Sequence, residues 1–362
     1  MIHKLVLTTI FLGVFIFTAC KNEAKKGESD TKTETGATTK DTQEDTTKAG
    51  TVPEAEVYFS SETVRPGNMA ITSSNRMFVT MNPLLSPKSK IYEIKANGEA
   101  TPYPNDEYVT GDNSVIKAVI GIRADSNDNL WLLDMGAKQF VVWDTKKNEL
   151  VKKLKLPEDV VLKTSFLQDF VIDEKHKRLI IADMTQGELK SAPTPAFIVV
   201  NMEDGSAKRM AQGHKSMMPE QEGGFALNPI AISPDFEWVY YGALSGRTIY
   251  RTPASAFDSD EKIIAGIEKF GKKSFCDGIA VDKNQNVYIT NIEEQAISVS
   301  NKDGLKNIAT LPKSQSWPDG LYIGNDGHVY STVDQLNRIP AMNKGKDDSK
   351  PPFLVIKTPL VK

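Results

Sequence analysis

The chain has 362 residues, of which 40% are hydrophobic and 25% charged, and its formal net charge is -3. This balance gives no electrostatic basis for binding nucleic acid. The two cysteines, Cys20 and Cys276, are too few for a disulfide framework.

The N-terminus predicts an export signal. After a short basic start, the apolar run from Leu5 to Phe17 is too short for a permanent membrane span, which needs about 20 residues. The run ends in Phe-Thr-Ala before Cys20, which resembles the box of bacterial lipoproteins, where the cysteine is lipidated. We expect residues 1–19 to be a lipoprotein signal peptide; the alternative is an ordinary cleaved signal.

Residues 20–52 predict a tether. They contain no aromatic residue and are mainly Thr, Lys, Glu, Asp, Gly and Ser. Such a segment cannot bury enough apolar surface to offset the entropy of ordering it. We therefore expect a disordered tether whose lipid, on Cys20, is the chain's only attachment to a membrane. Lys21 after the cysteine favours an extracytoplasmic location at the bacterial outer membrane.

Residues 70–332 repeat one pattern, in which an apolar strand, a polar turn and a second apolar strand follow each other. Six copies begin at Ala70, Gly121, Phe170, Ile230, Ile279 and Leu321. They recur about every 50 residues, which is typical of a propeller array. Because a second pair of strands follows most copies, each repeat predicts a four-stranded blade.

The fold class that follows is all-β, a six-bladed β-propeller over residues 53–362. Glu56–Ser60 has no repeat of its own, and an orphan strand of this kind commonly closes such a ring and removes free sheet edges. We expect this N-terminal strand to complete the last blade, with a strand from residues 352–356 nearby.

About two positions before each inner strand, where one mouth of the central channel is expected, five of six residues are polar. The positions are Asn68, Ile120, Gln168, Asn228, Asp277 and Asp319, with Asp169 beside Gln168. A ring of such oxygens suits Ca²⁺ or a cationic ligand, and two close carboxylates would give one a raised pKa, as a general base needs. Alternatively, these groups cap strand ends and bind water.

Other residues receive narrower interpretations. Trp317, next to Pro318 and Asp319, is the best aromatic candidate at the mouth, where it would hold an amine by a cation–π contact. The acids that recur at the hairpin turns, such as Asp125 and Asp282, indicate Asx turns and not chemistry.

Several motifs resemble the yellow/major royal jelly protein family across residues 55–345. Residues 228–253 resemble one blade of that family, and residues 121–134 match its G-V-R-x-D…L-W-V-x-D pattern. Asn337 and Arg338 lie in its S-N-R-L motif and join the ligand-binding candidates. The resemblance implies a six-bladed propeller and an extracytoplasmic protein; family members include proteins that bind small amines, but no shared catalytic set carries over.

Two further segments resemble the propellers of the gluconolactonase (SMP-30-like) family. These are residues 277–282 and Pro318-Asp319-Gly320-Leu321. That resemblance implies a divalent-metal site with Asn228 and Asp277 as ligands, Asp319 nearby, and Asp277 as the catalytic base. Where that family has a glutamate ligand this chain has Asn68, and a neutral amide is a weaker ligand for a hard cation.

Three functions remain open at this point. The first is a membrane-tethered, monomeric propeller that binds a small polar or cationic ligand, or Ca²⁺, at the axial channel mouth. The second is a metal-dependent lactonase-type hydrolase with Asp277 as base. The third is a scaffold for protein–protein interaction. The substitution at Asn68 disfavours the second.

Overall fold

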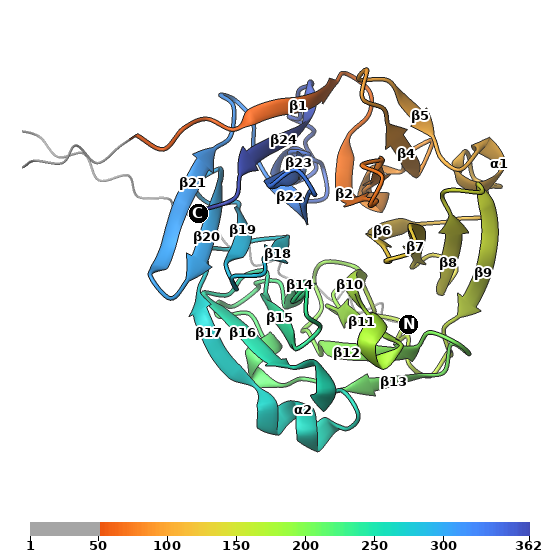
Figure 1. The fold of residues 1–362 in the computed structure, drawn as a ribbon, viewed down its shortest axis with the longest axis vertical. Helices are drawn as coiled ribbons and strands as arrows, with labels where there is room; N and C mark the ends of the chain where they lie inside the picture. Colours follow the sequence, from red (N-terminus) through yellow and green to blue (C-terminus); the bar gives the residue numbers. More distant parts are fainter. Residues whose placement is uncertain (1–50) are drawn as a thin grey trace, which may run out of the picture. The chain divides into compact units, whose positions relative to one another are not determined.

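The computed structural model describes residues 51–362. The predicted signal peptide, the lipidated Cys20 and nearly all of the predicted tether lie outside the described residues. Within the described part, the strands form six four-stranded antiparallel sheets arranged around a central axis (Figure 1). The predicted six-bladed β-propeller is confirmed.

The first three blades each use four consecutive strands. Blade 1 contains β2 (Pro66–Ile71), β3 (Met77–Met81), β4 (Ile91–Ile94) and β5 (Ala100–Pro102). Blade 2 contains β6 (Val119–Ala124), β7 (Asn129–Asp134), β8 (Gln139–Asp144) and β9 (Glu149–Lys155). Blade 3 contains β10 (Leu167–Asp173), β11 (Arg178–Asp183), β12 (Ala196–Asn201) and β13 (Ala207–Met210).

The last three blades continue around the ring. Blade 4 contains β14 (Leu227–Ile232), β15 (Trp238–Ala243), β16 (Thr248–Pro253) and β17 (Glu268–Lys272). Blade 5 contains β18 (Ile279–Val281), β19 (Val287–Asn291), β20 (Ala296–Asn301) and β21 (Gly304–Thr310). Blade 6 contains β22 (Pro318–Ile323), β23 (His328–Val333), β24 (Phe353–Pro359) and β1 (Glu56–Ser61).

Short helices lie in the connections between strands. The α-helices are α1 (Asp106–Val109) and α2 (Asp260–Gly266), and the 3₁₀ helices are η1 (Pro83–Leu85), η2 (Glu174–His176), η3 (Lys215–Met217), η4 (Ala254–Ala256) and η5 (Leu336–Arg338). Across residues 51–362, none of these helices has the length and apolar character that crossing a membrane requires.

The N-terminal strand closes the ring, as the sequence predicts. β1 pairs antiparallel with β24, so the outer half of blade 6 joins the two ends of the described chain (Figure 1). Glu56 lies opposite Lys357 in this pairing, and their side chains form an ion pair of 3.2 Å. Closure leaves β1 as the outer strand of a complete blade and not as an unpaired segment.

The hydrophobic core lies mainly between neighbouring blades. Trp131 and Phe140 of blade 2 pack with Phe170 of blade 3 in one cluster, and Trp143 of blade 2 packs with Phe78 of blade 1 in another. Similar clusters join the remaining pairs of adjacent blades. The repeat therefore buries each blade's apolar faces against its neighbours.

The acids at the hairpin turns act as predicted, as turn scaffolds. The carboxylate of Asp125 accepts hydrogen bonds from the backbone N–H groups of Asn127 and Asn129 and from the indole of Trp131. Asp282 is arranged in the same way, with acceptor contacts to its own turn and to the hydroxyl of Tyr288. The hydrogen bonds of these carboxylates therefore stabilise their own hairpins.

Candidate functional site

Five of the six inner strands carry a β-bulge near their first residues. The register shifts lie between Pro66 and Met69, Val119 and Ile122, Leu167 and Asp169, Leu227 and Ile230, and Pro318 and Leu321. The predicted mouth positions Asn68, Gln168, Asn228 and Asp319 fall within these shifts or at their edges. A bulge breaks the strict alternation of side chains and re-aims one of them, which accounts for polar residues on strands that are otherwise apolar.

Threonines on the second strands hold these irregular segments. The hydroxyl of Thr80 accepts from the backbone N–H of Asn68, and that of Thr332 accepts from Gly320. In blade 5, where Asp277 directly precedes β18, Thr290 accepts from both Asp277 and Gly278. The threonine that ends several repeat copies thus satisfies backbone donors that a bulged ladder leaves unpaired.

Glycines let the starts of the inner strands come together around the axis. A Cβ atom at Gly320 would lie 2.8 Å from the Cα of Asn68, and one at Gly278 would overlap the backbone oxygen of Asp319. No side chain fits at these distances. The Asp-Gly pairs at 277–278 and 319–320 therefore combine a buried carboxylate with the close backbone approach that places it near its neighbours.

Asp277 is a buried carboxylate whose hydrogen-bond partners are all neutral. Its Oδ1 accepts from the amide of Asn228 at 2.9 Å and from that of Gln168 at 3.3 Å, and its Oδ2 accepts from the indole N–H of Trp317 at 2.8 Å. Burial raises the pKa of Asp277, and these three donors oppose the rise. Within residues 51–362 no Lys, Arg or His forms an ion pair with it. Its negative charge therefore lacks an ionic partner.

The two amides beside Asp277 leave their carbonyl oxygens unpaired. Because a carboxylate only accepts hydrogen bonds, Gln168 and Asn228 must turn their NH₂ groups toward it. Oε1 of Gln168 and Oδ1 of Asn228 are buried and have no hydrogen-bond partner among residues 51–362. Unpaired buried acceptors are uncommon, and they indicate a place for an external donor.

Asp319 and Asp334 form a second acidic element. Both are buried, and Oδ2 of each has no N–H or O–H donor among residues 51–362. Burial raises the pKa of Asp319, and the negative charges of Asp277 and Asp334 raise it further. Burial also raises the pKa of Asp334. Such a pair retains one proton between its two carboxyl groups.

An ion pair joins the inner strands of neighbouring blades close to this acidic cluster. Arg123 on β6 donates to the carboxylate of Asp169 on β10 and, at 3.4 Å, to Oδ1 of Asn68 on β2. Burial raises the pKa of Asp169, and the guanidinium opposes that rise. This layer, which we call the Arg123 layer, spans blades 1, 2 and 3.

Above the cluster lies a cavity of about 40 Å³, the polar chamber. Its polar wall consists of Asn82, Gln168, Asn228, Asp277 and Trp317. Its remaining wall is an apolar collar of Leu84, Phe166, Met184, Leu189, Phe225, Leu244, Leu336 and Met342. Trp317 has a left-handed backbone (φ 59°), which is uncommon for a bulky residue and often marks a functional position.

Several predicted site residues lie elsewhere. Asn337 is exposed and accepts from the hydroxyl of Ser316, while Arg338 donates to the carbonyl of Ser314. Neither lines the polar chamber. Asn68 lies in the Arg123 layer, and Ile120 packs in one apolar cluster with Phe166 and Met184 of the collar.

The described residues hold no preformed metal site. Within residues 51–362, no three His, Cys, Asp or Glu side chains come together as a metal-binding group. Of the predicted metal ligands Asn228, Asp277 and Asp319, Asp277 already uses both oxygens to accept N–H donors. A cation bound there would have to share the Asp277 carboxylate with these donors.

Arg123 and Asp334 are the site residues that sequence reasoning missed. Arg123 is the one charged residue within the Gly121–Ala124 segment of its apolar strand. A single charge on a strand that is otherwise apolar could have identified it as a site residue. Asp334 directly follows β23, one position beyond the place that Asp134 and Asp183 hold at the ends of the second strands of blades 2 and 3, and this one-residue offset shows only once the strand register is known. Those two carboxylates bind loop backbone.

By fold and site, this protein is a six-bladed β-propeller with a small chamber lined by one buried carboxylate, Asp277, and an apolar collar. The chain belongs to the major royal jelly protein family, whose family model matches residues 117–359. Major royal jelly protein 9 of Apis mellifera is 28% identical over 176 residues, which cover 41% of this chain and 39% of that protein. Major royal jelly protein 8 of the same species is 23% identical over 198 residues, covering 48% and 47%. The chain thus spans less than half the length of these relatives.

Solved structures share the fold at low identity. A gluconolactonase from Xanthomonas campestris superposes with a TM-score of 0.56 at 12% identity, covering 84% of this chain and 89% of its own. A luciferin-regenerating enzyme gives 0.59 at 13%, with 85% and 96% covered. Regucalcin from Agrobacterium tumefaciens, a calcium-binding protein, gives 0.54 at 14%, with 86% and 96% covered. These likenesses establish the propeller architecture alone.

Proposed function

We propose that the polar chamber binds a small organic amine through its ammonium group. The observation that carries this proposal is Asp277, a buried carboxylate with three neutral donors and no ionic partner among residues 51–362. A cation would supply the missing charge. In the surrounding cluster, Arg123 compensates Asp169, and the proton shared by Asp319 and Asp334 lowers their joint charge, so the uncompensated charge centres on Asp277.

The unpaired oxygens favour an ammonium head over a quaternary one. An ammonium group carries N–H donors, and Oε1 of Gln168 and Oδ1 of Asn228 are acceptors without a donor. The charge on Asp277 lies directly behind both amides. Charge-assisted hydrogen bonds of this kind are about twice as strong as neutral ones.

The size and lining of the chamber suggest the rest of the ligand. About 40 Å³ accommodates a head group but not a ring, because an apolar cavity that holds benzene measures about 150 Å³. The apolar body must therefore lie among the collar residues. Met184 and Met342 are flexible enough to make room, and Phe166, Phe225 and Trp317 offer aromatic faces to the body or the cation.

Calcium binding and lactone hydrolysis receive less support from the site. Ca²⁺ takes six to eight oxygen ligands at roughly 2.3–2.6 Å, whereas Asp277 faces three N–H donors. The calcium-binding and gluconolactonase proteins of similar fold make Ca²⁺ the appropriate competitor to test.

The test is isothermal titration of the propeller, residues 51–362, with phenethylamine. We expect saturable binding that is lost in Asp277→Asn, which removes the charge and keeps the shape. Asp282→Asn is the matched control, because Asp282 is equally buried (both 6% exposed) but belongs to a turn. Binding that survives in Asp277→Asn, or that is lost equally in both variants, would contradict the proposal. Ca²⁺ binding that requires Asp277 would favour the metal alternative.

We also propose that a lipid on Cys20 holds the propeller at the outside of a bacterial membrane. The support comes from the sequence of residues 1–52. Cys20→Ser should release the protein from the membrane fraction and abolish incorporation of a labelled fatty acid. Retention of both label and membrane association in that variant would contradict the anchor.

A further inference from the structure

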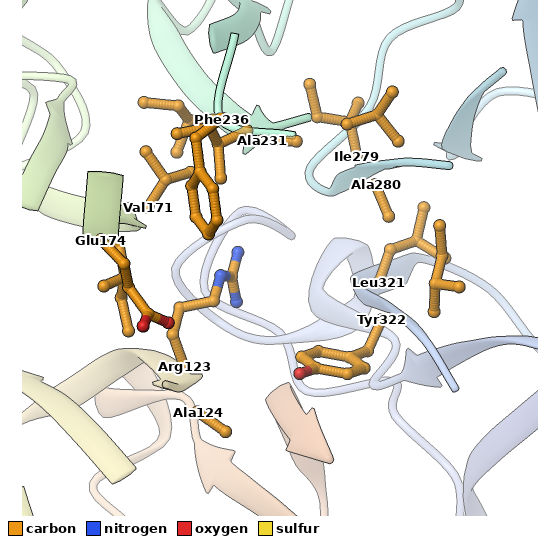
Figure 2. A pocket seen from close by; sticks show the side chains of 15 residues that line it. Arg123, Ala124, Val171, Glu174, Ala231, Phe236, Ile279, Ala280, Leu321 and Tyr322 are labelled. Atoms are coloured by element: carbon orange, nitrogen blue, oxygen red, sulfur yellow. The ribbon is translucent and has the colours of Figure 1, made fainter. Parts of the chain in front are cut away.

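A second cavity lies on the axis beyond the Arg123 layer. It measures about 270 Å³ and is lined by the later residues of five inner strands, β6, β10, β14, β18 and β22 (Figure 2). It shares no lining residue with the polar chamber. We call it the apolar chamber.

The Arg123 layer separates the two chambers. The guanidinium contacts Asp169 and Asn68 across three blades, and Arg123 also lines the apolar chamber. Asp169 adjoins Gln168, which lines the polar chamber. A ligand in one chamber therefore does not extend into the other while this layer is intact.

The wall of the apolar chamber combines aliphatic and aromatic side chains with the polar groups of Arg123, Glu174 and Tyr322 (Figure 2). Ala231, Ile279, Ala280 and Leu321 line it, and the ring of Phe236 projects into it from the turn between β14 and β15 (Figure 2). Phe236 has a left-handed backbone (φ 58°), and its N–H bonds the carbonyl of Ser233. The space exceeds the roughly 150 Å³ at which an apolar cavity binds benzene, so it accommodates a substituted ring.

Two charged groups, Glu174 and Arg123, face this space, and the Glu174 carboxylate already accepts hydrogen bonds from the protein. Glu174 accepts from the backbone N–H and the hydroxyl of Ser126, which fixes it at the rim. Arg123 directs its terminal nitrogens to Asp169, Asn68 and the carbonyl of Ile122. Within residues 51–362 its Nε has no acceptor, so this N–H remains among the donors that the guanidinium can offer to a ligand. Figure 2 shows the guanidinium, Glu174 and the Phe236 ring around the same space.

We propose that the apolar chamber binds a neutral, ring-sized organic molecule through a carbonyl oxygen that accepts from Arg123. A carboxylate ligand would be a second acid on a guanidinium that already pairs with Asp169, in a space that Glu174 also faces, and like charges disfavour it. An ammonium ligand would face the guanidinium itself. A neutral carbonyl satisfies the free N–H without either repulsion, while the ring packs against the apolar side chains of the wall. This site does not depend on the function proposed for the polar chamber.

Three probes with the same ring and a short linker test the charge argument. They are phenylacetamide, phenylacetate and phenethylamine, which present a neutral carbonyl, an anion and a cation. Ligand-detected NMR and titration calorimetry would be run on residues 51–362. We expect phenylacetamide to bind and phenylacetate to bind more weakly. Absence of phenylacetamide binding, or tighter binding of phenylacetate, would overturn the proposal.

Substitutions in the chamber wall test whether phenylacetamide binds in the apolar chamber. Ala280→Trp fills the chamber and should abolish phenylacetamide binding, whereas Lys283→Trp places the same ring on the exposed turn after β18 and should leave binding unchanged. Phe236→Ala is a second test that keeps the strands intact, and it should weaken binding by about tenfold through loss of the aromatic contact. Circular dichroism and melting confirm folding. Wild-type affinity in either Ala280→Trp or Phe236→Ala would overturn the assignment.

Discussion

The two ends of the inner strands differ in backbone regularity and in chemistry. At their starts, five strands are bulged, and polar side chains with unpaired oxygens gather around Asp277. At their ends the pairing is regular, and four of these strands, together with β18, line the apolar chamber. One repeated hairpin therefore builds two environments on a single axis.

The difference shows how a repeat fold gains a site without losing its core. Where side chains alternate regularly along a strand, the apolar ones stay in the clusters between blades. A polar residue that faces the axis therefore does not disturb the packing of those clusters. The bulges confine the irregular backbone to one end, where threonines satisfy the freed donors. The Arg123 layer divides the two ends.

Removing the dividing ion pair should have the largest effect on stability. Arg123→Met leaves Asp169 buried without its cation, which should lower the free energy of unfolding by about 3 kcal/mol in urea denaturation. The control is Lys95→Met, whose partner Glu99 is exposed, and it should change stability by less than about 1 kcal/mol. Equal, small effects in both variants would mean that Arg123 does not hold the layer together.

A methyl group at the constriction should be the next most damaging change. Gly278→Ala places a Cβ against the backbone oxygen of Asp319 and should cost about 2 kcal/mol of stability. At Gly246, where the nearest atom would lie 3.3 Å away, alanine should cost less. Thermal and urea denaturation of both variants compare the two positions, and equal stability would show that the polar end is not tightly constrained.

The shared proton predicts a pH dependence confined to the polar end. Because the pKa of Asp319 is raised above its ordinary value of 3.8, the folded protein binds more protons than the unfolded chain above about pH 4. This contribution to stability is complete below that pH and is lost as the pH rises through the folded-state pKa. Asp319→Asn mimics the protonated acid, so the variant should not lose this stability as the pH rises.

The measurement is the melting-temperature difference between Asp319→Asn and wild type from pH 4 to pH 8. We expect the variant's relative stability to increase with pH. A difference that stays constant, or that decreases, would show that Asp319 is ionised throughout in the folded protein.

The smallest expected effect concerns Trp317. Trp317→Phe keeps a ring but removes the N–H that Asp277 accepts, which should cost about 1 kcal/mol of stability. Trp143→Phe is the matched change, because its N–H bonds the amide oxygen of Asn148, a neutral and exposed partner. We expect Trp143→Phe to cost less, as urea denaturation would show, and the reverse order would contradict the buried-carboxylate account.

The fold could be predicted because its signals are local. Alternating apolar arms, polar turns and the recurring Asp at the turn appear within single hairpins, and their repetition gives the ring. The polar residues at the mouth, such as Asn228 and Asp277, could also be found by counting back from each inner strand. Ring closure followed from one strand, Glu56–Ser60, that had no repeat of its own.

The rest of the site could not be predicted because it depends on contacts between distant blades. Arg65 bonds the backbone of Asp334 across 269 residues of sequence, and Arg123 meets Asp169 from another blade. Asp334 lies one register position beyond Asp134 and Asp183, which bind loop backbone, and its partner Asp319 comes from the neighbouring strand of its own blade. The collar also combines loops from several blades, so no single segment shows its apolar character.

The most direct test of a divided axis is a crystal structure of residues 51–362 soaked with phenethylamine and phenylacetamide together. The account predicts the ammonium nitrogen beside Gln168 and Asn228, and the amide oxygen beside Arg123, in the same molecule. Both probes in one chamber, or an exchange of their positions, would contradict it.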